Sequence, residues 1–233
     1  MAQILTFLPG TMCDQRLWGP VWQRLIPRFS CDYVPTETEQ TREGMLGLIH
    51  SVASIWQPID LVAFSMGGYL ALEYALANPG RVASLITVGS SAFGLTDQEK
   101  ADRARALAML EKHDYRGMPA TRLNQFVHPS RQADPQVVDV IRAMDRDLGK
   151  AVLVAQLKET STRPSLAPRL AELEIPVLLV GADSDPFASW ETIERMAALI
   201  PGAKAVLANN AGHMVPIEQP DWLAQQIVEF HAR

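Results

Sequence analysis

The sequence predicts an α/β fold with a mostly parallel sheet of about six strands, flanked by helices and interrupted by a helical insert. Short apolar runs bounded by Gly and Pro alternate along the chain with segments of helical spacing. Residues 94–168 break this alternation, because they have helical periodicity and no convincing buried strand. The 233 residues are 48% hydrophobic and 20% charged, which is an ordinary balance for a chain that forms a core.

The part of the chain before the insert supplies four strands and three helices. We expect strands over residues 3–8, 31–34, 59–64 and 81–89, and helices over 17–26, 44–55 and 69–77. The first strand ends at Pro9-Gly10, and the third helix ends at Asn78-Pro79-Gly80, which are strong turn signals. Each strand is short and apolar, as expected for strands that are buried on both faces of a parallel sheet.

The insert and the part that follows it complete the prediction. We expect four insert helices, one opening at Asp97 and the others over residues 118–127, 134–148 and 153–160. Strands then follow over residues 175–180 and within 199–207, and a closing helix covers residues 221–230. The chain therefore divides into a core domain of residues 1–93 and 169–233 and a helical cap insert of residues 94–168.

Charge and hydropathy exclude several classes of partner. The formal net charge of −5 gives no bulk attraction to nucleic acid or to an anionic membrane. No apolar run approaches the ~20 residues that a bilayer span needs, and the N-terminal segment lacks a secretion pattern, so a cytoplasmic location is expected. The insert holds 12 Lys and Arg against 10 Asp and Glu, a net +2 that fits an anionic substrate, although a solvated helical surface is the preferred interpretation.

The cysteine and histidine pattern predicts neither a metal nor a cofactor. Cys13 and Cys31 are the only cysteines, and we expect them to be free thiols. No CxxC motif or His/Cys cluster is present. The expected partner is a small-molecule substrate, and the oligomeric state is left open.

A serine at a strand-to-helix junction is the candidate nucleophile. Ser65 follows the apolar strand over residues 59–64 and precedes a helix, so a sharp turn there projects its hydroxyl above the sheet. Such a turn needs small neighbours, and Ala63 and Gly67 provide them, with Ala63 replacing the more usual glycine. The alternative is that Ser65 only caps the following helix, but the strand–turn–helix context favours the nucleophile.

One of the five histidines is placed to act as the base. His213 lies in a loop after the last expected strand and before the last helix, and such loops are where parallel sheets place chemistry. A serine hydroxyl needs such a base to take its proton, and the base needs a carboxylate to orient it. Asp183 and Asp185, which follow the strand over residues 175–180, are the two candidates for that carboxylate.

The negative charge that forms during acyl transfer needs two backbone amides. Met66, the residue after the candidate nucleophile, supplies one, and its amide opens a helix. The loop after the first strand supplies the other, for which Thr11 is preferred and Met12 is the alternative. Gly10 permits the tight turn, although an ordinary Pro-Gly turn explains this dipeptide equally well.

Taken together, these segments resemble the α/β-hydrolase superfamily. The matching pieces are LPGTMCDQRLW, LVAFSMGGYLALEYA, RVASLITVGSSA, PVLLVGADSDPFAS and NNAGHMVPIEQPDWL. The chain looks most like the small bacterial esterases and lactonases around pimeloyl-carrier-protein methyl ester esterase and 3-oxoadipate enol-lactonase. Pro9-Gly10 replaces the His-Gly pair usual in that group, and the initial two-strand hairpin is missing.

The resemblance implies a site and an activity. It implies Ser65, Asp185 and His213 as catalytic residues. Asp185 is preferred because its interval to the Ile-Pro-Gly-Ala turn is the one usual in the family. This choice implies a one-residue insertion relative to the family between the glycine that ends the strand and the acid. It implies a serine hydrolase that cleaves a carboxylic ester, lactone or thioester of a small molecule. C–C bond cleavage with the same residues is the alternative enzyme class, and a non-catalytic ligand receptor is the alternative outside enzymes.

Overall fold

A single six-stranded sheet organises the molecule, in a computed structural model that describes residues 2–26, 28–55 and 58–232. All neighbouring strands run parallel, in the order β2-β1-β3-β4-β5-β6. The strands are β1 (Gln3–Leu8), β2 (Phe29–Tyr33), β3 (Ile59–Phe64), β4 (Val82–Val88), β5 (Val177–Ala182) and β6 (Lys204–Ala208). The predicted parallel sheet is confirmed.

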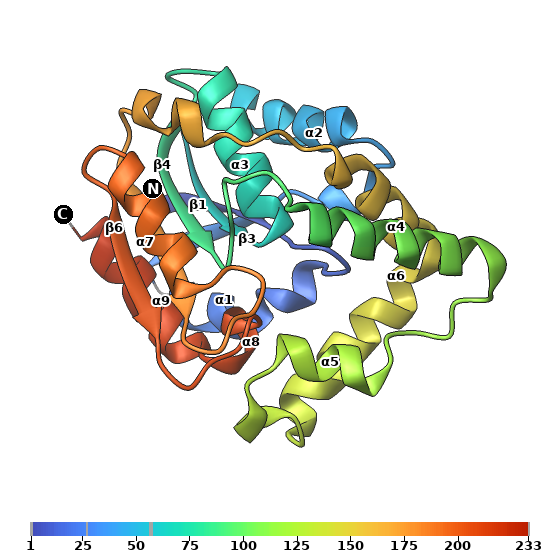
Figure 1. Ribbon diagram of the computed structural model, residues 1–233. Helices are drawn as coiled ribbons and strands as arrows, with labels where there is room; N and C mark the ends of the chain where they lie inside the picture. The colour runs from blue at the N-terminus through green and yellow to red at the C-terminus, as the bar shows by residue number, and fades with distance from the viewer. Residues whose placement is uncertain (1, 27, 56–57, 233) are drawn as a thin grey trace.

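Helices cover both faces of this sheet, because the apolar strands present side chains alternately to each face. Leu5 and Phe7 of β1 join the buried cluster that includes α1 (Gly19–Leu25) and α9 (Pro220–His231). Leu8 joins the opposite cluster, with α2 (Arg42–Ile55), α3 (Met66–Ala77) and α7 (Trp190–Leu199). In Figure 1, α2 and α3 lie toward the top of the view, and α1 and α9 lie toward the bottom.

The strand order places a topological switch point at the middle of the sheet. The chain passes from β1 outward to β2 and then returns to β3 on the other side of β1. The loops that leave the carboxyl ends of β1 and β3 therefore diverge at adjacent positions, which is where parallel α/β sheets open a crevice for ligands. Leu8 and Ala63 are register partners at this edge.

The insert is helical throughout the regular structure described between β4 and β5. It contains α4 (Asp97–Lys112), α5 (Ala120–Phe126) and α6 (Pro135–Ser161). The helices expected over residues 134–148 and 153–160 are the two halves of α6, which kinks at Gly149 (φ 71°). Buried residues of α5 and α6 join the α1 and α9 cluster, whereas α4 buries none of its residues.

Other boundaries shift only slightly from the predicted ones. β2 begins two residues earlier than expected, and the helix expected over residues 17–26 divides into a 3-10 turn (Gln15–Leu17) and α1. Two helices were not predicted, namely α7 and the short α8 (Val215–Glu218). Ser189 caps α7 by accepting a hydrogen bond from the Thr192 amide, so a start signal was present in the sequence.

Three large aromatic residues belong to the packing of the fold. Trp18 is fully buried, with its ring 5.0 Å from that of Phe7, and its indole N–H donates to the Leu8 carbonyl at 3.3 Å. Trp22 and Phe93 are half-buried and pack against the two core clusters.

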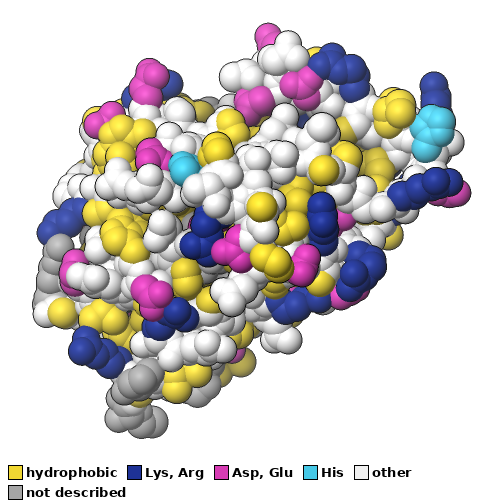
Figure 2. All heavy atoms as spheres, turned by 90° about the horizontal axis from the view of Figure 1, so that it is seen from below, with side chains coloured by type: hydrophobic (Ala, Val, Ile, Leu, Met, Phe, Trp, Pro, Cys, Tyr) yellow, Lys and Arg dark blue, Asp and Glu magenta, His cyan; other side chains and the backbone are white. Residues whose placement is uncertain are grey.

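The surface and the cysteines complete the description. Both cysteines are free thiols. On the face drawn in Figure 2, basic and acidic side chains are interspersed, and hydrophobic side chains gather in small groups. Across the described residues, no helix combines the length and apolarity that crossing a bilayer requires. The cytoplasmic location stays a prediction.

Candidate active site

Ser65 occupies a strained turn between β3 and α3. Its backbone has φ 51° and ψ −113°, a region that residues with a side chain rarely adopt and that costs about 1–3 kcal/mol. The Ser65 amide donates to the Val88 carbonyl at 2.8 Å, which helps to hold this conformation. Its side chain makes no capping hydrogen bond to α3, so the geometry does not support the interpretation of Ser65 as a simple helix cap.

The small residues around this turn allow close packing. A Cβ atom on Gly67 would collide with the Pro9 carbonyl oxygen, and one on Gly68 would collide with the Ser90 hydroxyl. The Ser90 hydroxyl donates to the Ser65 carbonyl at 2.8 Å and supports the turn from β4. The local sequence therefore lets α3 start directly above the sheet, with the Ser65 hydroxyl at its edge.

A continuous chain of hydrogen bonds links three side chains that are distant in the sequence. His213 Nε2 lies 3.0 Å from Ser65 Oγ, and His213 Nδ1 lies 2.8 Å from Asp185 Oδ2. His213 is 3% exposed and the Asp185 side chain is 0% exposed, whereas Ser65 is only half-buried. The imidazole and carboxylate are thus shielded from water while the hydroxyl remains accessible.

Asp185 is fixed by the backbone that follows it. Its Oδ1 atom accepts hydrogen bonds from the amides of Phe187 at 2.8 Å and Ala188 at 3.1 Å, which leaves Oδ2 for His213. The carboxylate is therefore held in one orientation, as a group that orients an imidazole must be.

Asp183, the other candidate, lies elsewhere and braces the loop that carries His213. It accepts hydrogen bonds from the amides of Asn210 at 2.7 Å and Ala211 at 3.2 Å. Burial alone would raise the pKa of Asp183, but these two amides, together with the Ser184 side chain and the charge of His128, outweigh it and hold the pKa below its usual value. The geometry therefore gives Asp183 a turn-forming role and sets Asp185 against the imidazole.

Three phenylalanine rings surround the imidazole of His213, and sequence reasoning missed all of them. The ring centroids of Phe64, Phe126 and Phe187 lie 4.8, 5.7 and 5.1 Å from that of His213. Phe126 comes from the insert and stacks on Phe187 at 4.8 Å. No sequence motif marks these positions, and the contacts of Phe126 form only when the insert packs on the core.

A buried carboxylate joins the His213 loop to the insert. Glu218 is 2% exposed and accepts hydrogen bonds from the amides of Gly212 at 3.0 Å and His128 at 2.8 Å. Burial raises the pKa of Glu218. A Cβ atom on Gly212 would lie 2.6 Å from the His128 nitrogen, so only glycine allows the two segments to come this close.

The loop after β1 lies against Ser65 and presents a free amide. A Cβ atom on Gly10 would lie 2.7 Å from Phe64 Cδ1 and 3.1 Å from Ser65 Cβ. The Met12 amide donates to Gln156 Oε1 at 2.9 Å and is therefore already engaged. In the part of the chain that the structure describes, the amides of Thr11 and Met66 donate to no protein acceptor. Thr11 is thus the better candidate donor of this loop.

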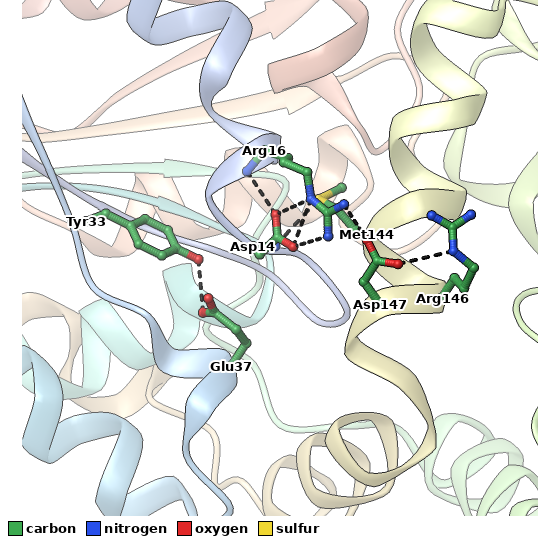
Figure 3. Close-up of polar contacts among 7 residues, drawn as sticks. All are labelled: Asp14, Arg16, Tyr33, Glu37, Met144, Arg146 and Asp147. Carbon is green, nitrogen blue, oxygen red and sulfur yellow. Dashed lines mark hydrogen bonds and ion pairs between the residues drawn. The ribbon is translucent and has the colours of Figure 1, made fainter.

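The same loop is tied to the first half of α6, as Figure 3 shows. Arg16 donates to Asp14 Oδ1 at 2.9 Å and to Asp147 Oδ2 of α6 at 2.7 Å. The Asp14 amide contacts the sulfur of Met144, also of α6, at 3.5 Å. Since Gln156 belongs to the second half of α6, both halves of this kinked helix contact the loop.

Two further histidines lie away from this site. His50 contacts Tyr74 on the surface of α2 and α3, and His231 ends α9. Among the described residues, no three His, Cys, Asp or Glu side chains gather as a metal-binding group. The absence of a metal or cofactor stays a prediction.

Comparisons with known proteins agree with this arrangement. A family model described as alpha/beta hydrolase fold matches residues 53–220. The pimeloyl-[acyl-carrier protein] methyl ester esterase of Yersinia enterocolitica is 24% identical over 97% of this chain and 92% of its own length. A putative 2-succinyl-6-hydroxy-2,4-cyclohexadiene-1-carboxylate synthase of Bacillus subtilis is 28% identical over 74% of this chain. The aligned part spans only 65% of that relative, and 62% of a 2-hydroxy-6-oxononadienedioate hydrolase of Pseudomonas putida.

Solved structures extend the similarity to the whole fold. A thermophilic esterase from Thermogutta terrifontis superposes with a TM-score of 0.88 at 24% identity, over 100% of this chain and 90% of that chain. The enol-lactonase from Burkholderia xenovorans superposes with a TM-score of 0.86 at 17% identity, over 100% and 92%. The predicted resemblance to esterases and lactonases of this fold is confirmed.

Proposed function

We propose, from the premise that this chain belongs to the alpha/beta hydrolase fold family, that it is a serine hydrolase acting on a carboxylic ester, lactone or thioester of a small molecule. The observation that carries the proposal is the hydrogen-bonded chain from Ser65 through His213 to Asp185. Serine nucleophile, imidazole base and buried carboxylate in this geometry are the parts that acyl transfer requires.

The proposed reaction has two acyl-transfer steps. Ser65 Oγ attacks the substrate carbonyl carbon while His213 Nε2 takes the hydroxyl proton, and Asp185 stabilises the imidazolium. His213 then gives the proton to the leaving alcohol, and the C–O bond of the ester breaks. Water adds to the acyl-enzyme in the same way, releasing the acid and restoring the Ser65 hydroxyl.

The amides of Thr11 and Met66 are proposed to hold the carbonyl oxygen as it becomes negative. Both lie at the edge where β1 and β3 end, and Met66 opens the 12-residue helix α3, whose dipole adds to the stabilisation. Gly10 supports this role, because its lack of a Cβ atom lets the loop approach Ser65.

Residues 94–168 are proposed to act as a cap on a core domain of residues 1–93 and 169–233. Phe126 of α5 reaches the His213 ring, and Gln156 of α6 binds the Met12 amide, so the insert contacts both sides of the candidate site. In Figure 1, the insert helices extend to the right of the sheet, on the side where α3 begins. A cap placed there would select the substrate.

Cleavage of a C–C bond by the same three residues is the second candidate. It is favoured by one relative, the 2-hydroxy-6-oxononadienedioate hydrolase, because its printed substrate name contains no ester. The same hydroxyl and base serve both chemistries, so the substrate decides between them.

Labelling with a fluorophosphonate, followed by a panel of p-nitrophenyl esters of increasing chain length, tests the proposal. We expect labelling of the protein and of a Ser91→Ala control, no labelling of Ser65→Ala, and turnover of at least one ester. Ser91 is a suitable control because it is also half-buried and follows β4 at the same edge of the sheet. Labelling without ester turnover would favour C–C cleavage, and failure to label would favour a ligand receptor.

A further inference from the structure

Beside the oxyanion loop, the insert contains a buried hydrogen-bond donor for which the described residues provide no acceptor. Gln156 is 0% exposed, and its Oε1 atom accepts the Met12 amide at 2.9 Å. Its Nε2 atom is buried and, within the described residues, has no hydrogen-bond partner. An unsatisfied buried donor costs about 1–3 kcal/mol, so such a group is expected to serve a ligand.

Two arginines come from α4, which packs against α6, and from the segment that follows α6. Arg103 of α4 donates to Thr160 Oγ1 at 2.7 Å, and that hydroxyl donates in turn to the main-chain carbonyl of Gln156 at 2.7 Å. Arg163 follows α6, and its Nε atom is a second buried donor without an acceptor among the described residues. The Arg163 guanidinium lies 4.9 Å from the ring of Tyr69, one helical turn after the nucleophile.

Neither of these two positive charges is paired with a carboxylate in the part of the chain that the structure describes. No ion pair of the described residues includes Arg103 or Arg163. Burial, and then the charge of Arg163, lower the pKa of Arg103 to about 10. The charge of Glu99 favours the protonated form of both guanidinium groups. The Glu99 carboxylate is, however, already engaged at the start of α4, where it accepts hydrogen bonds from the Thr96 amide at 2.7 Å and the Thr96 hydroxyl at 2.8 Å.

We propose that Arg103, Gln156 and Arg163 form a subsite that binds a carboxylate group of the substrate. The proposal rests on the proposed function and narrows it to substrates that carry a free carboxylate. The buried atoms without a partner in the described part of the chain, Gln156 Nε2 and Arg163 Nε, are both donors, and guanidinium groups pair with the planar carboxylate through parallel hydrogen bonds. A bound carboxylate would satisfy the buried amide and compensate the two positive charges together.

The place of this subsite determines how a substrate would lie. Gln156 contacts Met12, which follows the proposed oxyanion donor Thr11, and Arg163 contacts Tyr69. The carboxylate would therefore lie on the side of Ser65 that faces the oxyanion loop. The phenylalanine rings around His213 leave an apolar environment on the other side for the uncharged part of the substrate.

A pair of esters matched in length tests the subsite. Mono-p-nitrophenyl glutarate carries a terminal carboxylate, and p-nitrophenyl pentanoate has a methyl group in its place. We expect Arg103→Met to lower kcat/KM for the glutarate ester by about 10- to 100-fold, as loss of a hydrogen bond to a charged group does. For the pentanoate ester we expect a change of less than about 2-fold, since no charged hydrogen bond is lost.

Arg105→Met is the matched control, because Arg105 lies on the same helix, is exposed and pairs with Asp102. It removes the same charge from α4 and is expected to leave kcat/KM for both esters unchanged. The proposal would be overturned if Arg103→Met lowered kcat/KM equally for the two esters. It would also be overturned if Arg105→Met lowered kcat/KM for the glutarate ester as much as Arg103→Met does.

Binding to an inactive protein separates the subsite from the chemistry. In the Ser65→Ala protein, glutarate is expected to raise Tm relative to sodium chloride at equal ionic strength, and Arg103→Met is expected to abolish the shift. A shift without turnover of any ester would retain the subsite and reject the proposed ester hydrolysis. No shift with glutarate, or a larger shift with inorganic phosphate, would overturn the carboxylate assignment.

Discussion

The sheet and the insert contribute different parts of the candidate site. Ser65, Asp185 and His213 follow β3, β5 and β6, so the parallel direction of the strands brings them to one edge. The groups that would recognise a substrate, such as Phe126 and Gln156, come instead from helices of the insert. The comparison suggests that the reacting groups are fixed by the sheet, while the choice of substrate is fixed by how the insert packs on it.

The two regions also differ in how firmly they are packed. All six residues of β5 are buried, whereas α4 buries none of its residues. A helix with few buried contacts opens at a lower free energy than a central strand. Changes in the sheet-borne groups should therefore abolish chemistry, and changes in the insert should alter recognition and local stability.

The largest difference in kcat between matched variants is expected for the two aspartates that follow β5. Asp185→Asn should lower kcat by roughly 10⁴-fold with little change in Tm, because the amide no longer holds His213 in the required tautomer. Asp183→Asn is the matched control, since it loses one of its two hydrogen bonds to the loop amides and no contact with the imidazole. It should lower Tm and leave kcat within about 10-fold, because only loop positioning is affected. The opposite ranking of the two variants in kcat would contradict the assignment.

The next effect concerns the loop after β1. Gly10→Ala should lower kcat by about 10²- to 10³-fold, as loss of an oxyanion donor does, because the new Cβ atom pushes the loop away from Phe64 and Ser65. Gly19→Ala is the control, since a Cβ atom there meets nothing within 4 Å. Steady-state kinetics on an activated ester would measure both. An unchanged kcat in Gly10→Ala would place the oxyanion donors elsewhere.

A smaller effect tests the link between the sheet and the insert. Glu218→Gln leaves one oxygen to accept two backbone amides, so it should lower the free energy of unfolding by about 1–3 kcal/mol. Urea denaturation of both proteins would measure this difference.

The pH dependence of that difference has a definite sign. Because burial raises the pKa of Glu218, its contribution to stability is full below the unfolded value and falls as pH rises through the folded value. The stability advantage of the wild-type protein over Glu218→Gln should therefore shrink as pH rises from about 4 toward neutrality. An advantage that grows with pH would contradict the buried, raised-pKa carboxylate.

An effect of similar size is expected within the insert. Gly149 has φ 71° at the kink of α6, so Gly149→Ala should cost about 1–3 kcal/mol although nothing lies within 4 Å of the new Cβ atom. Gly47→Ala also meets nothing and lies in α2, where alanine should stabilise the protein by up to about 1 kcal/mol. Thermal unfolding would show the contrast. If Gly149→Ala and Gly47→Ala changed Tm by the same amount, a side chain at position 149 would not strain the kink of α6.

The sequence predicted which residues of the sheet-borne half lie together, while their catalytic roles stay a proposal. Ser65 and His213 could be proposed as site residues because a strand-to-helix turn and a loop after a strand are local patterns that the linear sequence displays. Asp185 was separable from Asp183 only through resemblance, since both follow the same strand and only the folded loop shows which one faces the imidazole.

The insert-borne half was not predictable in the same way. The helical character of residues 94–168 followed from periodicity, and the kink at Gly149 agrees with the gap between two expected helices. The contacts of Phe126, Gln156 and Glu218 did not follow, because they join segments far apart in the sequence. Their residue types are also common in helix cores and turns, so no local signal distinguishes them.

Replacement of the hydroxyl at the strained turn after β3 tests the account most directly. Ser65→Ala should lower kcat for an activated ester by about 10⁴-fold or more, because no nucleophile remains for His213 to deprotonate. Its Tm should stay close to that of the wild-type protein, since the Ser65 side chain makes no capping hydrogen bond. Full turnover by correctly folded Ser65→Ala protein would contradict the account.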